Sequence, residues 1–327
     1  PVLEEIREEL LDWKGLGLSV MEISHRSDEF MNLASEGRSD FIQLLKIPEE
    51  YCVLFLHGGA TLQMAMIPLN FSQKEGQAEY VNSGYWAQKA IKEARKFIQV
   101  NIAASSETSN FNFFPPQKSW QIQSNSSYIH ITPNETIGGI RLANLERMDL
   151  PIIADYSSGI LSGPLNVGNF GVIYGGAQKN IGPAGLGFVI VDKELLGSAQ
   201  ETTPSPMNYF KLDESSSMYN TPPTFSWYVA GKVFKWLKGK GGVKAIGQMN
   251  ERKAKKLYEF IDKSDWLPEI YQIGIRNPQG MAFSSFDNAG QRCTAIKRIL
   301  LYNNVADKFI EKFIVGRLKP RRCGPLP

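Results

Sequence analysis

The sequence is poor in cysteine and contains no long apolar run. Its three cysteines, Cys52, Cys293 and Cys323, are too scattered for a disulfide framework or a zinc site, which fits a reduced, intracellular setting. No apolar run reaches the ~18–20 residues that a membrane-spanning helix needs. The net charge of +3 is close to neutral for 327 residues, so composition gives no case for a nucleic-acid partner. We therefore expect a cytoplasmic protein with no metal and with neither a membrane nor a nucleic acid as partner.

The first residues lack both a signal-peptide pattern and an initiator methionine, so we expect the start of the chain to be missing. A chain of 327 residues can bury a large core in two domains, or in one domain with an appendage. Its hydrophobic content of 43% and charged content of 21% are ordinary for a soluble protein.

Strands alternate with helical stretches between about residues 50 and 240, which predicts an α/β fold with a mostly parallel sheet. The glycines near 239–242 indicate a boundary between a large domain, 1–240, and a small C-terminal domain, 241–327. Expected strands are 51–56, 79–84, 97–103, 128–132, 151–155, 170–174 and 188–191. Expected helices are 2–13, 27–45, 62–69, 85–94, 224–238, 249–265 and 306–315.

Lys179 lies in a glycine-rich turn between two of these expected strands. Gly175 and Gly176 precede it, and Gly182-Pro-Ala-Gly185 follows. Most lysines are solvated surface charges. A desolvated lysine amine loses its proton more easily and can form a Schiff base with an aldehyde. The pattern makes Lys179 a candidate for the lysine that binds pyridoxal phosphate (PLP).

PLP also needs an acid for its ring nitrogen and cover for its ring. Asp155 ends an expected strand, so it can lie at the same sheet edge as Lys179, although a turn aspartate is the plainer interpretation. Trp86 can cover the ring, and its alternative is a core position. Thr136 follows a strand and can bond the ring hydroxyl, or it can simply cap a turn.

The PLP phosphate needs hydrogen-bond donors. A strand followed by the turn 58–61 offers the free amides of a helix start, which include those of Ala60 and Thr61. Other polar side chains can add donors, although each is also an ordinary turn residue: Ser157, Gln178, Asn220 and Thr221. The pair His25-Arg26 is a plausible grip for a second anion, with a surface pair as its alternative.

Seven segments in order resemble the phosphoserine aminotransferase family: 19–26, 57–61, 84–86, 133–136, 154–155, 176–185 and 219–224. The resemblance is collinear over about residues 1–265. It implies the fold-type I architecture of PLP-dependent transferases, with a large domain on a mostly parallel sheet and a smaller C-terminal α+β domain. It also implies a homodimer with shared active sites.

The resemblance assigns roles residue by residue. Lys179 would bind PLP covalently, Asp155 would hold the ring nitrogen, and Trp86 would stack on the ring. Further residues would line the cofactor: Ala60, Thr61, Thr136, Ser157 and Gln178. Asn220 and Thr221 would reach the phosphate of the partner subunit's cofactor, and His25 and Arg26 would grip the substrate phosphate.

The C-terminal part departs most from the family. Arg292 and Arg298 fall on the two arginines that bind substrate in the family, but Gln291 replaces a histidine and Ala295-Ile296 replace glycines. Residues 266–289 and 306–327 match poorly. Some members also carry arginine where this chain has Thr61.

The sequence thus predicts a PLP-dependent aminotransferase of serine biosynthesis. It would pass the amino group of glutamate to 3-phosphohydroxypyruvate and give O-phosphoserine and 2-oxoglutarate. A role in pyridoxine biosynthesis, through phosphohydroxythreonine as a second substrate, stays open.

Three alternatives also stay open: another PLP enzyme of the same fold, a PLP-binding but inactive protein, and a dinucleotide-binding module. A cysteine desulfurase needs a mobile cysteine, and Cys52 lies in an apolar strand, which argues against it. A dinucleotide-binding module would carry G-x-G-x-x-G after its first strand, and residues 57–63 do not.

Overall fold

The computed structural model describes residues 1–262 of the chain. Residues 263–327 lie outside the described residues. They include most of the expected C-terminal domain, the expected helix over 306–315 and the arginines Arg292 and Arg298. The division into domains 1–240 and 241–327 therefore stays a prediction.

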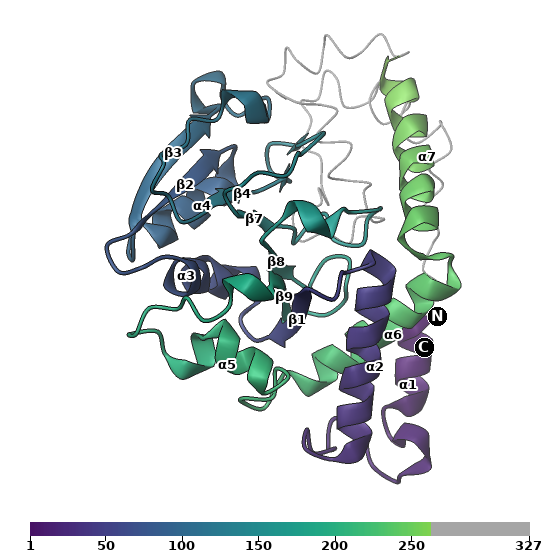
Figure 1. Ribbon diagram of the computed structural model, residues 1–327. Helices are drawn as coiled ribbons and strands as arrows, with labels where there is room; N and C mark the ends of the chain where they lie inside the picture. Colours follow the sequence, from purple (N-terminus) through teal and green to yellow (C-terminus); the bar gives the residue numbers. More distant parts are fainter. Residues whose placement is uncertain (263–327) are drawn as a thin grey trace, which may run out of the picture. The chain divides into compact units, whose positions relative to one another are not determined.

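Seven strands form one mixed sheet in the order β1-β9-β8-β7-β4-β2-β3 (Figure 1). They are β1 Tyr51–Leu56, β2 Gln77–Asn82, β3 Gln99–Ser105, β4 Ile129–Ile131, β7 Ile152–Asp155, β8 Val172–Gly176 and β9 Gly187–Asp192. β9 is antiparallel to both of its neighbours, and the other pairings are parallel. The prediction of a mostly parallel sheet is confirmed. Two short strands, β5 Asn134–Glu135 and β6 Ile140–Arg141, form a separate antiparallel pair.

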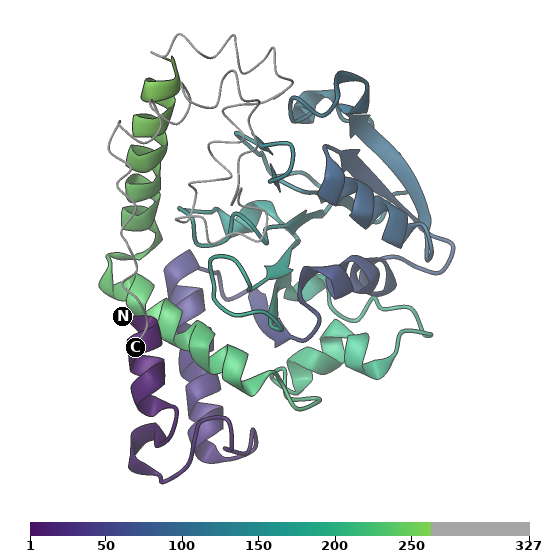
Figure 2. The same ribbon diagram turned by 180° about the vertical axis from the view of Figure 1, so that it is seen from behind.

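Helices cover both faces of the large sheet (Figures 1 and 2). On one face lie α1 Val2–Glu9, α2 Asp28–Leu45 and α6 Thr224–Gly239, and on the other lie α3 Gly59–Phe71, α4 Tyr85–Ala94 and α5 Tyr209–Glu214. The helix α7 Gly242–Asp262 follows α6. Single 3-10 turns are η1 Trp13–Gly15, η2 Glu107–Ser109, η3 Gln117–Ser119, η4 Val167–Asn169, η5 Lys193–Leu195 and η6 Ser205–Met207. Among residues 1–262, no helix is both long and apolar enough to cross a lipid bilayer.

The central strands are apolar on both sides because both sides are covered. In β1, Val53 and Phe55 join the core under α2 and α6, whereas Leu54 and Leu56 join the core under α3. A strand buried on both faces has the continuous apolar sequence of residues 51–56, not an alternating one.

An aromatic cluster fixes α2 and α6 against the sheet. The rings of Phe41 in α2 and Phe234 in α6 lie 5.1 Å apart between centroids, and those of Phe55 in β1 and Trp227 in α6 lie 5.0 Å apart. All four side chains are fully buried, and burying each one contributes about 1.5–3 kcal/mol. The cluster holds β1 and therefore the turn that follows it.

Two helix ends test the sequence predictions. Ser27 caps α2 as predicted, because its Oγ accepts a hydrogen bond from the Phe30 N–H at 3.3 Å. For the expected helix 249–265, the predicted start at Met249 is wrong, because α7 begins at Gly242. Gly241 and Gly242 turn the chain with φ of +90° and +71°, and the new helix starts at once.

Candidate functional site

The carboxyl ends of six strands lie at one edge of the sheet. β3, β2, β4, β7 and β8 are neighbours and run parallel. β1 runs in the same direction as β8, because β9 is antiparallel to both. Ligands bind at this edge in open α/β sheets. The segments that follow these strands carry most of the residues singled out in the sequence.

A cavity of about 370 Å³ lies at this edge. Seven of the predicted residues line it: Ala60, Thr61, Trp86, Asp155, Ser157, Gln178 and Lys179. They come from the turns after four different strands, so only the folded sheet brings them together. The predicted grouping of the lysine with the acid, the aromatic ring and the glycine-rich turn is therefore present in the structure.

Lys179 is held in a tight turn between β8 and β9. The N–H of Ala177 donates to the Leu186 carbonyl at 2.8 Å, and the N–H of Gly182 donates to the Ala177 carbonyl at 2.7 Å. Gly185, with φ of +93°, takes a backbone conformation that favours glycine. The Lys179 side chain is only 8% exposed, and its Nζ lies 5.7 Å from the centroid of the Trp86 ring.

Asp155 is a buried carboxylate with a fixed orientation. Its Oδ1 accepts hydrogen bonds from the Ser157 N–H at 2.9 Å and from the Ser157 hydroxyl at 2.5 Å. The N–H of Gly176 in turn donates to Ser157 Oγ at 3.1 Å, which ties the β7 turn to β8. Burial raises the pKa of Asp155, while the Ser157 hydrogen bonds and the charge of Lys179 act in the opposite direction. A further cationic group beside this carboxylate would therefore stabilise its charged form.

The start of α3 offers backbone amides to an anion. Gly58 precedes the helix with φ of +80° and provides no side-chain cap, and the first turn contains no acid. At Gly187, an added Cβ would lie 3.2 Å from the Gly59 Cα, so this glycine permits the close approach of β9 to the turn. Unpaired N–H groups and the helix dipole favour a phosphate at such a position.

Trp86 lies in the first turn of α4, beside the same cavity. Its indole Nε1–H donates to Thr136 Oγ1 at 3.2 Å, so Thr136 contacts the ring although it does not line the cavity itself. On the outer side, the ammonium group of the exposed Lys89 lies 5.2 Å from the Trp86 ring centroid. The ring thus lies within 6 Å of one buried and one exposed lysine.

The sequence interpretation assigned no role to Thr132, Asn134 and Ser158, which line the cavity, or to Glu135 beside it. Glu135 is fully buried, and its carboxylate accepts hydrogen bonds from the N–H groups of Trp86 and Ala87. The available signal was an acid inside the segment 133–136, directly after the expected strand 128–132. That signal alone does not name the helix that the acid caps.

Four of the predicted residues do not reach the cavity within this chain. Arg26 is exposed and His25 half-buried in the loop before α2, while Asn220 and Thr221 are exposed before α6. The Thr221 carbonyl lies 2.6 Å from His57 Nε2, next to the turn that starts α3. Arg292 and Arg298 lie outside the described residues.

The one cysteine of the described part, Cys52, is a poor nucleophile. Its thiol is buried in β1, and burial together with the nearby Asp213 raises its pKa. This agrees with the argument against a desulfurase as far as residues 1–262 are concerned. No cluster of three or more histidine, cysteine or acidic side chains that could hold a metal occurs in the same residues.

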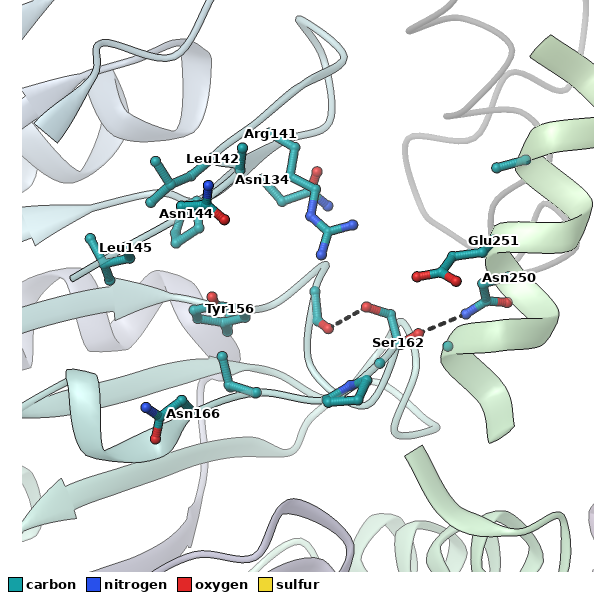
Figure 3. A pocket seen from close by; sticks show the side chains of 18 of the residues that line it. Asn134, Arg141, Leu142, Asn144, Leu145, Tyr156, Ser162, Asn166, Asn250 and Glu251 are labelled. Atoms are coloured by element: carbon teal, nitrogen blue, oxygen red, sulfur yellow. Dashed lines mark hydrogen bonds between the residues drawn. The ribbon is translucent and has the colours of Figure 1, made fainter. Parts of the chain in front are cut away.

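A second cavity, of about 430 Å³, lies between the loops that follow β4 and β7 and the helix α7 (Figure 3). The side chain of Asn250 in α7 donates to the Ser162 carbonyl at 2.9 Å and joins the two walls. This cavity is larger, but Lys179 and Asp155 do not line it. The chemistry of the lining therefore assigns the functional site to the smaller cavity.

The residues of the smaller cavity fit PLP in their chemistry. A buried lysine can bind an aldehyde, a buried carboxylate can pair with a ring N–H, and the start of α3 can receive a phosphate. The buried Asp155 carboxylate favours a cationic group of a ligand. Burial raises the pKa of Asp155, and a positive charge beside it would offset that effect.

Comparisons with known proteins show the family of this chain. The family model for class-V aminotransferases matches residues 1–306. A phosphoserine aminotransferase of Hahella chejuensis is 44% identical over 332 residues, which cover 96% of this chain and 92% of that protein. One from Acidithiobacillus ferrooxidans is 52% identical over 264 residues, covering 80% and 73%.

Solved structures extend the likeness to the fold. The phosphoserine aminotransferase of Bacillus circulans matches with a TM-score of 0.78 at 41% identity, over 80% of this chain and 73% of that one. The PLP-bound enzyme of Trichomonas vaginalis matches with a TM-score of 0.77 at 36% identity, over 80% and 78%. The fold, the cavity and both kinds of relative agree, and the chain belongs to the class-V aminotransferases and, within them, to the phosphoserine aminotransferase family.

Proposed function

We propose that this chain is a PLP-dependent aminotransferase that passes the amino group of glutamate to 3-phosphohydroxypyruvate. The products are O-phosphoserine and 2-oxoglutarate, and the reaction belongs to serine biosynthesis in the cytoplasm. The observation that carries the proposal is the meeting of Lys179, Asp155 and Trp86 at one cavity beside the start of α3, in a chain of this family.

Each cavity residue has a physical role in holding the cofactor. The amides of Ala60 and Thr61 would bind the phosphate, with Ser157 and Gln178 as further donors. Asp155 would pair with the ring nitrogen, and Ser157 holds that carboxylate in place. Trp86 would cover one face of the ring and exclude water from it. Thr136, beside the cavity, orients the indole and would bind the ring hydroxyl.

Bound PLP supplies an aldehyde for the amino group and a ring that takes up the electron pair of the broken C–H bond. Lys179 binds that aldehyde through its Nζ. The free Nζ of Lys179 would act as the general base that removes the substrate α-proton and would deliver it to the former aldehyde carbon, which is the transfer that transamination requires. Burial of Lys179 and Asp155 keeps water away from this proton.

A second copy of the chain would complete the site. Asn220 and Thr221 would reach the cofactor phosphate of the partner, and His25 and Arg26 would bind the substrate phosphate. All four lie outside the cavity of their own chain. Leu11, Leu16, Leu18 and Met21, which precede His25 in the sequence, are 46–84% exposed and would supply apolar area for such an interface. Arg292 and Arg298 are proposed to bind the carboxylate of the substrate.

The visible absorption spectrum of the purified protein tests this proposal. We expect a band of lysine-bound PLP that shifts when O-phosphoserine is added, because the amino group of the substrate replaces Lys179. Serine, which lacks the phosphate, is the matched control and should shift the band only at much higher concentration. A protein that shows no such band after addition of PLP would contradict the proposal.

Arg26→Ala is expected to raise the KM for O-phosphoserine about 10- to 100-fold while leaving the PLP band unchanged. The reason is the loss of a charged hydrogen bond to phosphate, which is worth about 1.5–3 kcal/mol. Steady-state kinetics with both phosphorylated substrates measures the effect. Arg95→Ala removes another exposed arginine, at the end of α4, and serves as the control. An unchanged KM in Arg26→Ala would refute the phosphate role.

A further inference from the structure

We infer that Glu135 is a positioning residue that fixes the Trp86 ring beside the cavity by capping the helix on which Trp86 lies. The inference rests on the proposed role of Trp86 as the cover of the cofactor ring. Glu135 itself does not line the cavity, whereas Trp86 does.

The carboxylate of Glu135 binds the first turn of α4 at two points. Its Oε2 accepts from the Trp86 N–H at 3.1 Å, and its Oε1 accepts from the Ala87 N–H at 2.8 Å. The residue before α4 is Gly84, which has no side chain to cap the helix. The cap therefore comes from β5, about fifty residues further along the chain.

The next residue of the same segment holds the other end of Trp86. Thr136 Oγ1 accepts from the indole Nε1–H at 3.2 Å. Two consecutive residues thus bind the main chain and the ring of one tryptophan. This two-point attachment fixes both the position of the Trp86 Cα and the rotation of its ring.

Gly84 leaves the space that the Glu135 side chain needs. A Cβ added at Gly84 would lie 2.7 Å from Glu135 Cδ and 2.9 Å from both Cγ and Oε2. The φ of Gly84 is 161°, which is extended backbone, so the glycine is explained by this contact and not by backbone strain.

The charge of Glu135 suits a helix start. The pKa of Glu135 is raised to about 7, mainly by burial. The charge of Asp155 also raises this pKa, whereas the N–H groups of Ala87 and Trp86 and the charge of Lys179 lower it. At about pH 8.5 the carboxylate is therefore the main form, and it accepts hydrogen bonds through both oxygens. A glutamine at this position would keep one acceptor and turn an amide donor towards the second N–H.

The test compares Glu135→Gln with Glu79→Gln at about pH 8.5. Glu79 is a matched control because it is also buried and also accepts a backbone N–H, that of Gln123, but it lies on β2 away from the cavity lining. Protein labelled with fluorotryptophan is examined without PLP by fluorine NMR, and Trp86→Phe assigns the Trp86 signal. PLP affinity is then measured by absorbance.

In Glu135→Gln we expect the Trp86 signal to shift and broaden and the Kd for PLP to rise about tenfold, which corresponds to about 1.4 kcal/mol. Gly84→Ala, which crowds Glu135 without removing it, should give the same two changes and is the second variant if Glu135→Gln does not fold. Glu79→Gln should lower stability without either change.

The inference is overturned if Glu135→Gln or Gly84→Ala leaves the Trp86 signal and the Kd unchanged, or if Glu79→Gln alters them equally. The NMR readout in protein without PLP tests the cap on its own. Failure of the unaltered protein to take up PLP would instead contradict the proposed function.

Discussion

Lys179→Ala is expected to lower the turnover number at least about ten-thousandfold, because the same amine both binds the cofactor aldehyde and moves the substrate proton. Each role alone contributes a large factor, since general acid–base catalysis supplies about 10²–10⁴-fold. Lys179 is 8% exposed within a tight turn. In the variant, a neighbouring lysine could not bring its amine to this position unless the backbone of the turn changed.

The covalent bond can be measured separately from activity. Reduction with borohydride followed by mass spectrometry should place PLP on the peptide that contains Lys179, and the variant should carry none. Lys89→Ala is the control, because Lys89 also lies within 6 Å of the Trp86 ring but not in the cavity lining. It should keep activity within about twofold, as surface changes usually do. Full activity in Lys179→Ala, or a PLP adduct on another lysine of the unaltered protein, would contradict the mechanism.

The sequence predicted the strands well where burial is two-sided. Residues 51–56 form one short apolar run that ends before Gly58, and β1 has those bounds. The start of α2 could also be predicted from the sequence, because the side chain of Ser27 caps the helix. In both cases the signal is local, so one stretch of sequence contains all of it.

The start of α7 could not be predicted because its cause is tertiary. Gly242 and Gly247 favour a loop, because glycine has a low helix propensity. In the structure an added Cβ at Gly247 would lie 3.2 Å from the Gly163 Cα, so the glycine permits a close backbone contact with the loop after β7. Packing of this kind overrides helix propensity, and Gly163 lies more than eighty residues away.

The same distinction applies to the site. Lys179 and Asp155 were predicted together because parallel strands bring their carboxyl ends to one edge. Glu135 was missed because its function depends on Trp86, which no local pattern connects to it. The roles of His25, Arg26, Asn220 and Thr221 depend on a second copy of the chain and stay predictions.

Asp155→Asn is expected to lower the turnover number about 10²- to 10⁴-fold while the protein still binds PLP through Lys179. The Asp155 carboxylate is 6% exposed, and burial raises its pKa. A protonated ring nitrogen beside it would therefore stabilise its charged form. Asparagine keeps an acceptor for Ser157 but loses the charge. Breaking one partner of a buried ion pair costs about 3–5 kcal/mol, and each 1.36 kcal/mol is tenfold in rate.

Single-turnover kinetics of the PLP-loaded variants, followed by absorbance, measures this loss apart from substrate binding. Asp192→Asn is a close control, since Asp192 also ends a strand and accepts a hydrogen bond from the N–H two residues on, that of Glu194 at 3.0 Å. Its activity should stay within about twofold, because Asp192 lies outside the cavity lining. If the two variants had equal turnover numbers, the role of Asp155 would be limited to its hydrogen bonds with Ser157. The ring nitrogen would then need a different partner.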